Sequence, residues 1–120
     1  MINIDVQTQY VEGQSEPENE RFVFAYTITI TNGTALQCQL LNRHWIITDA
    51  TGDVEEVQGE GVVGQKPQLP PGESFQYTSG AVLKTPVGSM HGEYEFVDAQ
   101  GERFFAAIPA FSLSVPNLVH

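Results

Sequence analysis

Apolar and polar residues alternate with a period of two along most of the chain, the pattern of strands that bury one face. The clearest run is Phe22 to Thr31, where aromatic and β-branched residues occupy one face and threonines the other. Few positions follow a helical period, so the sequence predicts an all-β fold of seven or eight short antiparallel strands, as a sandwich rather than a barrel. The expected strands are 2–10, 22–31, 36–47, 54–58, 75–83, 94–96, 104–108 and 111–115.

The breaks in this alternation predict the connections. Asn32-Gly33 tolerates positive φ and predicts a hairpin between the strands on either side. A change of parity between Leu40 and Leu41 predicts a β-bulge within a long strand, and residues 54–58 are short and acidic, as expected of an edge strand. Turns are predicted at 49–53 and 98–101, and longer connections at 12–20, 59–72 and 85–92.

Composition narrows the class of protein. The 120 residues are 41% hydrophobic, so we expect one folded domain over 1–120. Five basic and 15 acidic residues give a net charge of −10, which excludes nucleic acid and anionic lipid as favoured partners and leaves cationic partners and divalent metals open. The single cysteine, Cys38, cannot form an internal disulfide. No apolar run exceeds five residues and no leader is visible, so we expect no membrane insertion and a cytoplasmic location.

One segment matches the G-x-G-x-x-G pattern of nucleotide-binding loops, with glycines at Gly59, Gly61 and Gly64. The dinucleotide motif requires a helix directly after the glycines, whereas here the prolines of residues 65–71 forbid one. The pattern therefore favours a turn-forming role. A backbone nest that holds a small anion with the help of Lys66 is the alternative.

Other candidate chemistry lacks the necessary spacing. The three histidines (His44, His91 and His120) and Cys38 form no zinc motif, and Ser79 lies outside a nucleophile elbow. The carboxylates form no calcium loop, so weak, exposed magnesium or calcium binding is open but a built cage is not expected. The sequence predicts a protein without catalytic residues, resident cofactor or structural metal.

Trp45 is the only tryptophan and shares its parity with Leu41 and Ile47, which indicates packing in the core. Its neighbours Arg43 and His44 are expected at a surface. A tryptophan partly exposed beside an arginine is instead typical of a binding hot spot.

Several long segments give the chain a resemblance to the ApaG family over nearly its whole length. They are LLNRHWIITDATG (40–52), EVQGEGVVGQKPQLPPGESFQYTSG (56–80), TPVGSMHGEY (85–94) and IPAFSL (108–113). The resemblance implies an immunoglobulin-like sandwich of the fibronectin type III kind, with a tyrosine, Tyr94, that ties a corner. Bacterial members of the family are linked to cobalt resistance and magnesium efflux, and the family name reflects a genetic association with diadenosine tetraphosphate hydrolysis. In eukaryotes a similar domain is joined to other modules, where it resembles a protein-interaction domain.

Two hypotheses follow. The first is a non-catalytic interaction module in divalent-cation homeostasis, not itself a transporter, with a protein partner and a contact surface at Gly59–Gly80, Arg43 and His44. The second is a sensor that binds Mg²⁺ or Co²⁺ at surface carboxylates, or a pyrophosphate-containing nucleotide at Gly59–Gly64 with Lys66. Exposed edge strands are compatible with either a monomer or a dimer.

Overall fold

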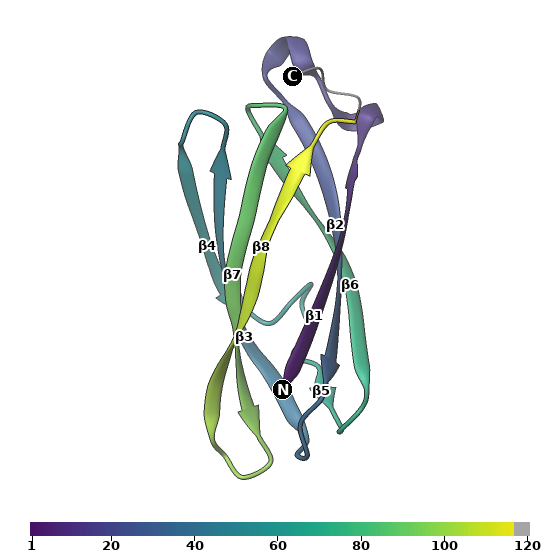
Figure 1. Ribbon diagram of the computed structural model, residues 1–120, viewed down its shortest axis with the longest axis vertical. Helices are drawn as coiled ribbons and strands as arrows, with labels where there is room; N and C mark the ends of the chain where they lie inside the picture. Colours follow the sequence, from purple (N-terminus) through teal and green to yellow (C-terminus); the bar gives the residue numbers. More distant parts are fainter. Residues whose placement is uncertain (117–120) are drawn as a thin grey trace.

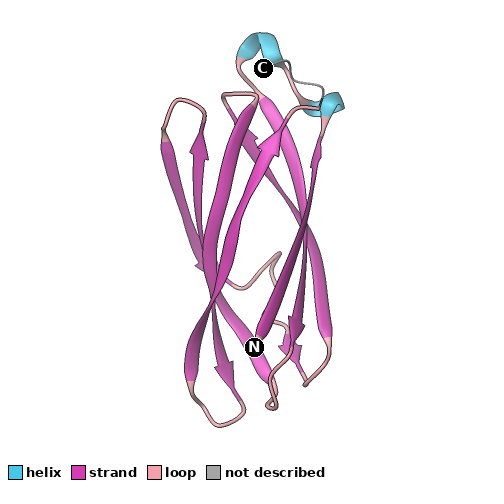
Figure 2. Ribbon diagram, viewed as in Figure 1, coloured by secondary structure: helices cyan, strands magenta, loops and turns pink. Residues whose placement is uncertain are grey.

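The structure is a computed structural model that describes residues 1–116, and strands make up most of it (Figure 2). Two short 3-10 helices, η1 (Glu12–Gln14) and η2 (Pro17–Asn19), occupy the acidic connection after the first strand. The eight strands of the described range are β1 (Ile2–Tyr10), β2 (Phe22–Asn32), β3 (Cys38–Asp49), β4 (Val54–Glu60), β5 (Gln68–Leu69), β6 (Ser74–Leu83), β7 (Val87–Asp98) and β8 (Arg103–Ser114).

The strands form two antiparallel sheets that face one another (Figure 1). One sheet has the order β1-β2-β6, and the other has the order β4-β3-β7-β8, with β5 paired to β3. Alternate residues of each strand point into the space between the sheets, as in the register pairs Ile4 with Ile30 and Ile28 with Tyr77. The all-β sandwich of the immunoglobulin and fibronectin type III kind is confirmed.

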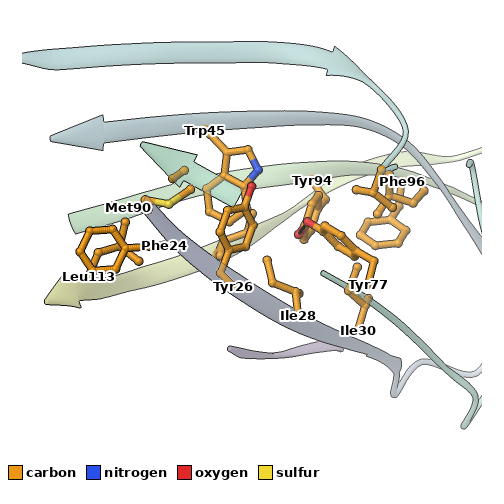
Figure 3. Packing of buried hydrophobic residues seen from close by; sticks show 14 of the residues in the cluster. Phe24, Tyr26, Ile28, Ile30, Trp45, Tyr77, Met90, Tyr94, Phe96 and Leu113 are labelled. Atoms are coloured by element: carbon orange, nitrogen blue, oxygen red, sulfur yellow. Dashed lines mark hydrogen bonds between the residues drawn. The ribbon is translucent and has the colours of Figure 1, made fainter. Parts of the chain in front are cut away.

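Aromatic side chains dominate the core between the sheets (Figure 3). Trp45 is 2% exposed and makes edge contacts with Tyr26, Tyr94 and Phe111, so its expected place in the core is confirmed. The hydroxyl groups of Tyr77 on β6 and Tyr94 on β7 share a hydrogen bond, which joins the two sheets. Tyr94 thus pairs with a side chain of the opposite sheet.

The predicted bulge in β3 is present, since the register with β7 shifts between Leu40 and Asn42. One extra residue inverts the order of inward and outward positions along the rest of the strand. As a result, Leu40 and Trp45 are both buried although they are five residues apart. The bulge therefore turns Arg43 toward the same side as Trp45, and turns Asn42 and His44 to the outer face.

The predicted hairpin at Asn32-Gly33 is wrong, because β2 and β3 belong to different sheets. Asn32 is fully buried, and its amide Nδ2 donates to the carbonyl oxygens of Leu36 and Leu69, both at 2.8 Å. Its Oδ1 accepts from the backbone N–H and the hydroxyl of Thr34. Asn32 therefore stabilises the connection between the two sheets instead of forming a hairpin turn.

The predicted connection at 85–92 is also wrong beyond its first residues, since β7 begins at Val87. The glycines there allow close approach of backbones rather than a turn. A Cβ on Gly92 would lie 1.9 Å from the carbonyl oxygen of His44, and one on Gly88 would lie 2.7 Å from that of Thr48. The two strands predicted at 104–108 and 111–115 are likewise one strand, β8, which continues through Pro109. β8 is an edge strand, and its register with β7 shifts between Met90 and Gly92, which accommodates the proline.

Candidate functional site

Arg43 on β3 lies opposite Gly59 on β4 in the register of the sheet. A Cβ added to Gly59 would lie 2.8–2.9 Å from three atoms of the Arg43 guanidinium, so the missing side chain is what makes room for it. Arg43 Nη1 donates to the carbonyl oxygens of Glu60 and Gly61 at 2.9 and 3.0 Å. The arginine thus fastens the start of the glycine-rich loop to the sheet.

The loop then closes a tight turn from Val62 to Gln65. The N–H of Val62 donates to the carbonyl of Gln65 at 2.8 Å, and the N–H of Gln65 donates back at 2.9 Å. The two central residues, Val63 and Gly64, both have positive φ, at 43° and 78°, which is the geometry of a type I′ turn. Gly61 has a φ of 62°, and a Cβ there would lie 2.3 Å from the carbonyl oxygen of Gln65.

The two valines of this turn have opposite environments. Val62 is fully buried in the hydrophobic core, whereas Val63 is 53% exposed. A β-branched residue rarely adopts a left-handed conformation, so Val63 is held under backbone strain. The loop is consequently anchored at one residue and presents the next one to solvent.

Each glycine of the motif therefore has a structural role: Gly59 accommodates an arginine, and Gly61 and Gly64 adopt positive φ. Three of the loop N–H groups on which a phosphate cradle would draw are already bonded to carbonyl oxygens. Gly61 donates to the carbonyl of Leu41 at 2.8 Å, and Val62 and Gln65 donate to one another. Lys66 Nζ lies 3.1 Å from Glu60 Oε1 in an exposed ion pair.

A pocket of about 180 Å³ lies between this loop and strand β6. Within residues 1–116, no carboxylate lies within 4.0 Å of the Arg43 guanidinium, whereas Lys66 and Arg103 each have one. Burial raises the pKa of Tyr77, against the smaller effect of Arg43, so the phenol stays protonated over the physiological range. The lining residues are Tyr26, Arg43, Trp45, Val62, Val63, Gly64, Tyr77 and Ser79.

A second pocket, of about 490 Å³, lies on the outer face of the same sheet. His44 belongs to this face, where its Nε2 lies 3.4 Å from Glu56 Oε2. Asn42 Nδ2 donates to Glu95 Oε1 at 2.7 Å. The wall also includes Phe105, an aromatic side chain that is 63% exposed.

The structure thus divides the residues that the sequence singles out. Arg43 lies beside the three glycines of the loop, and Lys66 is in an exposed pair next to them. His44 lies on the outer face, where Arg43 and Gly59 line the second pocket with it. Tyr77 and Ser79 complete the first pocket from the other sheet. The alternation along 75–83 predicts that these two residues share a face, but no spacing in the sequence indicates that this face lies against the glycine loop.

Over residues 1–116, no group of three or more histidine, cysteine, aspartate or glutamate side chains could hold a metal ion. None of the helices described is long and apolar enough to cross a membrane.

Comparison with known proteins gives a consistent result. Residues 12–98 match the family model of the ApaG domain. Protein ApaG of Enterobacter sp. (strain 638) is 56% identical over 99% of this chain and 95% of its own length, and that of Azoarcus sp. (strain BH72) is 54% identical over 99% and 94%. The crystal structure of the putative ApaA protein from Bordetella pertussis superimposes with a TM-score of 0.95 at 47% identity, over 98% of this chain and 96% of that one.

Proposed function

The chain belongs to the ApaG domain family, and on that premise we propose that it is a non-catalytic protein-interaction module. Its contact surface is the segment Gly59–Gly80, which begins with the glycine-rich loop, together with Arg43 and the neighbouring His44. The partner is a protein of divalent-cation homeostasis, the process behind cobalt resistance and magnesium efflux, and the chain assists that process without being a transporter itself.

The observation that carries this proposal is the way the glycine loop is held. Three of its backbone N–H groups and the Nη1 group of Arg43 bond to carbonyls of the loop or the neighbouring strand. Val62 is buried in the core while Val63 projects beside it. A loop fixed in this way does not close over a ligand, but it presents an apolar side chain in one defined position, which favours recognition by a partner.

The site also lacks the arrangement that acyl or phosphoryl transfer needs. Ser79 borders the pocket, but no histidine or carboxylate lines that pocket with it. The nearest histidine in sequence to Arg43 is His44, which lies on the outer face against Glu56. This separation of nucleophile and base supports a binding role over a hydrolytic one.

A matched pair of substitutions tests the proposal. Val63→Asp places a charge on the projecting turn, and Val82→Asp places one on β6 at a valine that is exposed to a similar degree, 49% against 53%. We expect a protein that co-purifies with the wild-type chain to be retained by Val82→Asp and lost with Val63→Asp. Equal retention by both variants, with both folded by circular dichroism, would overturn the proposed surface.

A Co²⁺ titration separates this proposal from a metal sensor. With isotope-labelled protein, we expect paramagnetic broadening of amide signals to be weak and spread over the acidic segments, because the described carboxylates do not converge. Saturable broadening of one cluster at micromolar Co²⁺ would instead identify a sensor and overturn the interaction module as the primary role.

A further inference from the structure

We propose that the pocket beside Arg43 binds the C-terminal carboxylate of a partner chain whose last residue is apolar. This inference rests on the proposed interaction function and specifies the chemistry that the contact surface recognises. It is carried by three features of the pocket: the spare donors of Arg43, the exposed Val63, and the free edge of β6.

Only one of the three nitrogens of the Arg43 guanidinium makes hydrogen bonds within residues 1–116. Both bonds to the loop carbonyls come from Nη1, which leaves Nε and Nη2 without a hydrogen bond to another residue of 1–116. These atoms are not sealed from solvent, since no buried side-chain nitrogen or oxygen of the described range lacks a partner. Nε and Nη2 form the edge of the guanidinium that can donate two parallel hydrogen bonds to one carboxylate.

The absence of an internal partner is informative in a chain with 15 acidic residues. Lys66 and Arg103 each have a carboxylate within 3.6 Å, and Arg21 and Lys84, which have none within 4.0 Å in the described range, are exposed. Arg43 is the only one of the five lysine and arginine residues that is not exposed, and a charge-assisted pair there contributes more than at the surface. A half-buried cation with free donors at a pocket is a recognition site for an anion from outside.

Val63 supplies the apolar side of the site. A left-handed conformation is unfavourable for a valine relative to ordinary backbone, whereas Asn or Gly adopts it more readily. The valine is also exposed, so burial in the core does not account for it. Strain of this kind at an exposed residue that borders a pocket is expected where the side chain contacts a partner.

The anion is a carboxylate rather than a phosphate on grounds of charge and donors. The carbonyl oxygens of Glu60 and Gly61 already face the guanidinium, and the chain carries a net charge of −10, so a second negative charge would be repelled. A phosphate would also need the backbone N–H groups that Gly61, Val62 and Gln65 have committed elsewhere.

The pocket's neighbourhood favours a chain end over an internal acidic side chain. A C-terminal residue presents its carboxylate and its side chain from one Cα, so an apolar last residue reaches Arg43 and Val63 together. β6 is an edge strand of its sheet, and Ser79, whose hydroxyl makes no hydrogen bond within residues 1–116, lines the pocket from it. An extended partner backbone can therefore approach along this edge.

Amide chemical shifts of isotope-labelled protein test the proposal with small probes. N-acetylvaline should shift the signals of residues 61–65 and 79 in a saturable way, whereas its neutral amide should not. Arg43→Lys keeps the charge but removes the two-pronged geometry and should weaken binding about tenfold. Arg103→Lys, on the exposed pair with Glu95, is the matched control and should leave the affinity unchanged.

Further probes and one further variant decide the remaining outcomes. Ser79→Ala should weaken the binding of N-acetylvaline by a few fold. Because Ser79 lies on β6 and not on the glycine loop, this variant gives a second readout if Arg43→Lys loosens the loop. Stronger binding of inorganic pyrophosphate, or equal binding of N-acetylaspartate α-amide, would overturn the assignment to a chain terminus. If N-acetylvaline has no effect while Val63→Asp still loses the co-purifying protein, the carboxylate proposal fails and the interaction module stands. If N-acetylvaline binds but neither valine variant changes retention of the co-purifying protein, the pocket binds a carboxylate and the proposed contact surface of the interaction module fails.

Discussion

Three turns of this protein can be compared because each has a glycine with positive φ. The turns that close the β3–β4 and β7–β8 hairpins are built alike, on Asp49 and on Asp98. In each, the aspartate Oδ1 accepts from backbone N–H groups two and four residues later, and the glycine, with a φ of 91° or 83°, comes three residues after the aspartate. Both segments follow the residue preferences of their turn at every position.

The turn of Val62–Gln65 departs from those preferences. Its first central residue is Val63, although an asparagine or a glycine would fit a φ of 43° without strain. Asp49 and Asp98 also border pockets, but in both aspartate turns only the glycine has a positive φ, whereas the Val62–Gln65 turn places a valine in that conformation beside Arg43. Local sequence and local structure therefore agree in the two aspartate turns, and disagree in the turn that presents a valine beside Arg43.

The largest effect should come from Gly61→Ala. The new Cβ would lie 2.3 Å from the backbone carbonyl oxygen of Gln65, at a residue whose φ is already 62°. A backbone atom cannot move aside as a side chain can, so we expect a loss of about 2–4 kcal/mol in the free energy of unfolding. Urea denaturation of the variant and the wild type measures it.

Gly64→Ala is the matched control for that substitution. Gly64 has a φ of 78°, but a Cβ there would meet no atom within 4 Å. The free energy of unfolding of this variant should fall only by the cost of placing a side chain at positive φ, about 1 kcal/mol. Equal losses for the two variants would show that the close approach to Gln65 does not hold the loop.

Val63→Asn should stabilise the protein. It replaces a strained valine by the residue preferred before glycine in a type I′ turn, so we expect a gain of about 1 kcal/mol in the free energy of unfolding. The gain should appear as a higher midpoint of urea denaturation. The same variant should bind N-acetylvaline more weakly, because the apolar contact is lost.

The two readouts of this variant decide between strain kept for recognition and strain without a role. A stability that is unchanged or lower would mean that the valine makes compensating contacts. A higher stability together with unaltered binding of N-acetylvaline would remove Val63 from the recognition surface while leaving the turn geometry as described.

Much of the fold follows from the sequence because it depends on local pattern. The alternation along Phe22–Thr31, the acidic edge strand at 54–58, the parity change after Leu40 and both aspartate turns are all present in the structure. Where the sequence misleads, a residue serves a contact with a distant loop or a neighbouring strand instead of a turn. Asn32 bonds to the backbone of a distant loop, and Gly92 admits the carbonyl of His44.

The candidate site is predictable only in the part that lies on neighbouring strands. Arg43 and the glycines of 59–64 meet because β3 and β4 form a hairpin, which the turn at 49–53 predicts. Tyr77 and Ser79 join them from the opposite sheet, through contacts set by the packing of the two layers. The sequence also cannot distinguish buried Val62 from exposed Val63, because they are adjacent and identical.

The smallest effect concerns the charge of an aspartate turn. The hydroxyl of Thr51 donates to Asp49 Oδ1 at 2.6 Å and, with smaller help from backbone N–H groups and against slight desolvation, lowers the pKa of Asp49 below the ordinary value of 3.8. Because the folded-state pKa is the lower one, the charged form stabilises the fold above about pH 4, and this contribution is lost as the pH falls through the folded-state pKa. Thr51→Val removes the hydroxyl and keeps the backbone bonds, so the Asp49 pKa, followed through its carboxyl carbon signal, should rise toward 3.8. An unchanged pKa in the variant would mean that the backbone N–H groups alone hold the Asp49 carboxylate and that the Thr51 hydroxyl adds nothing.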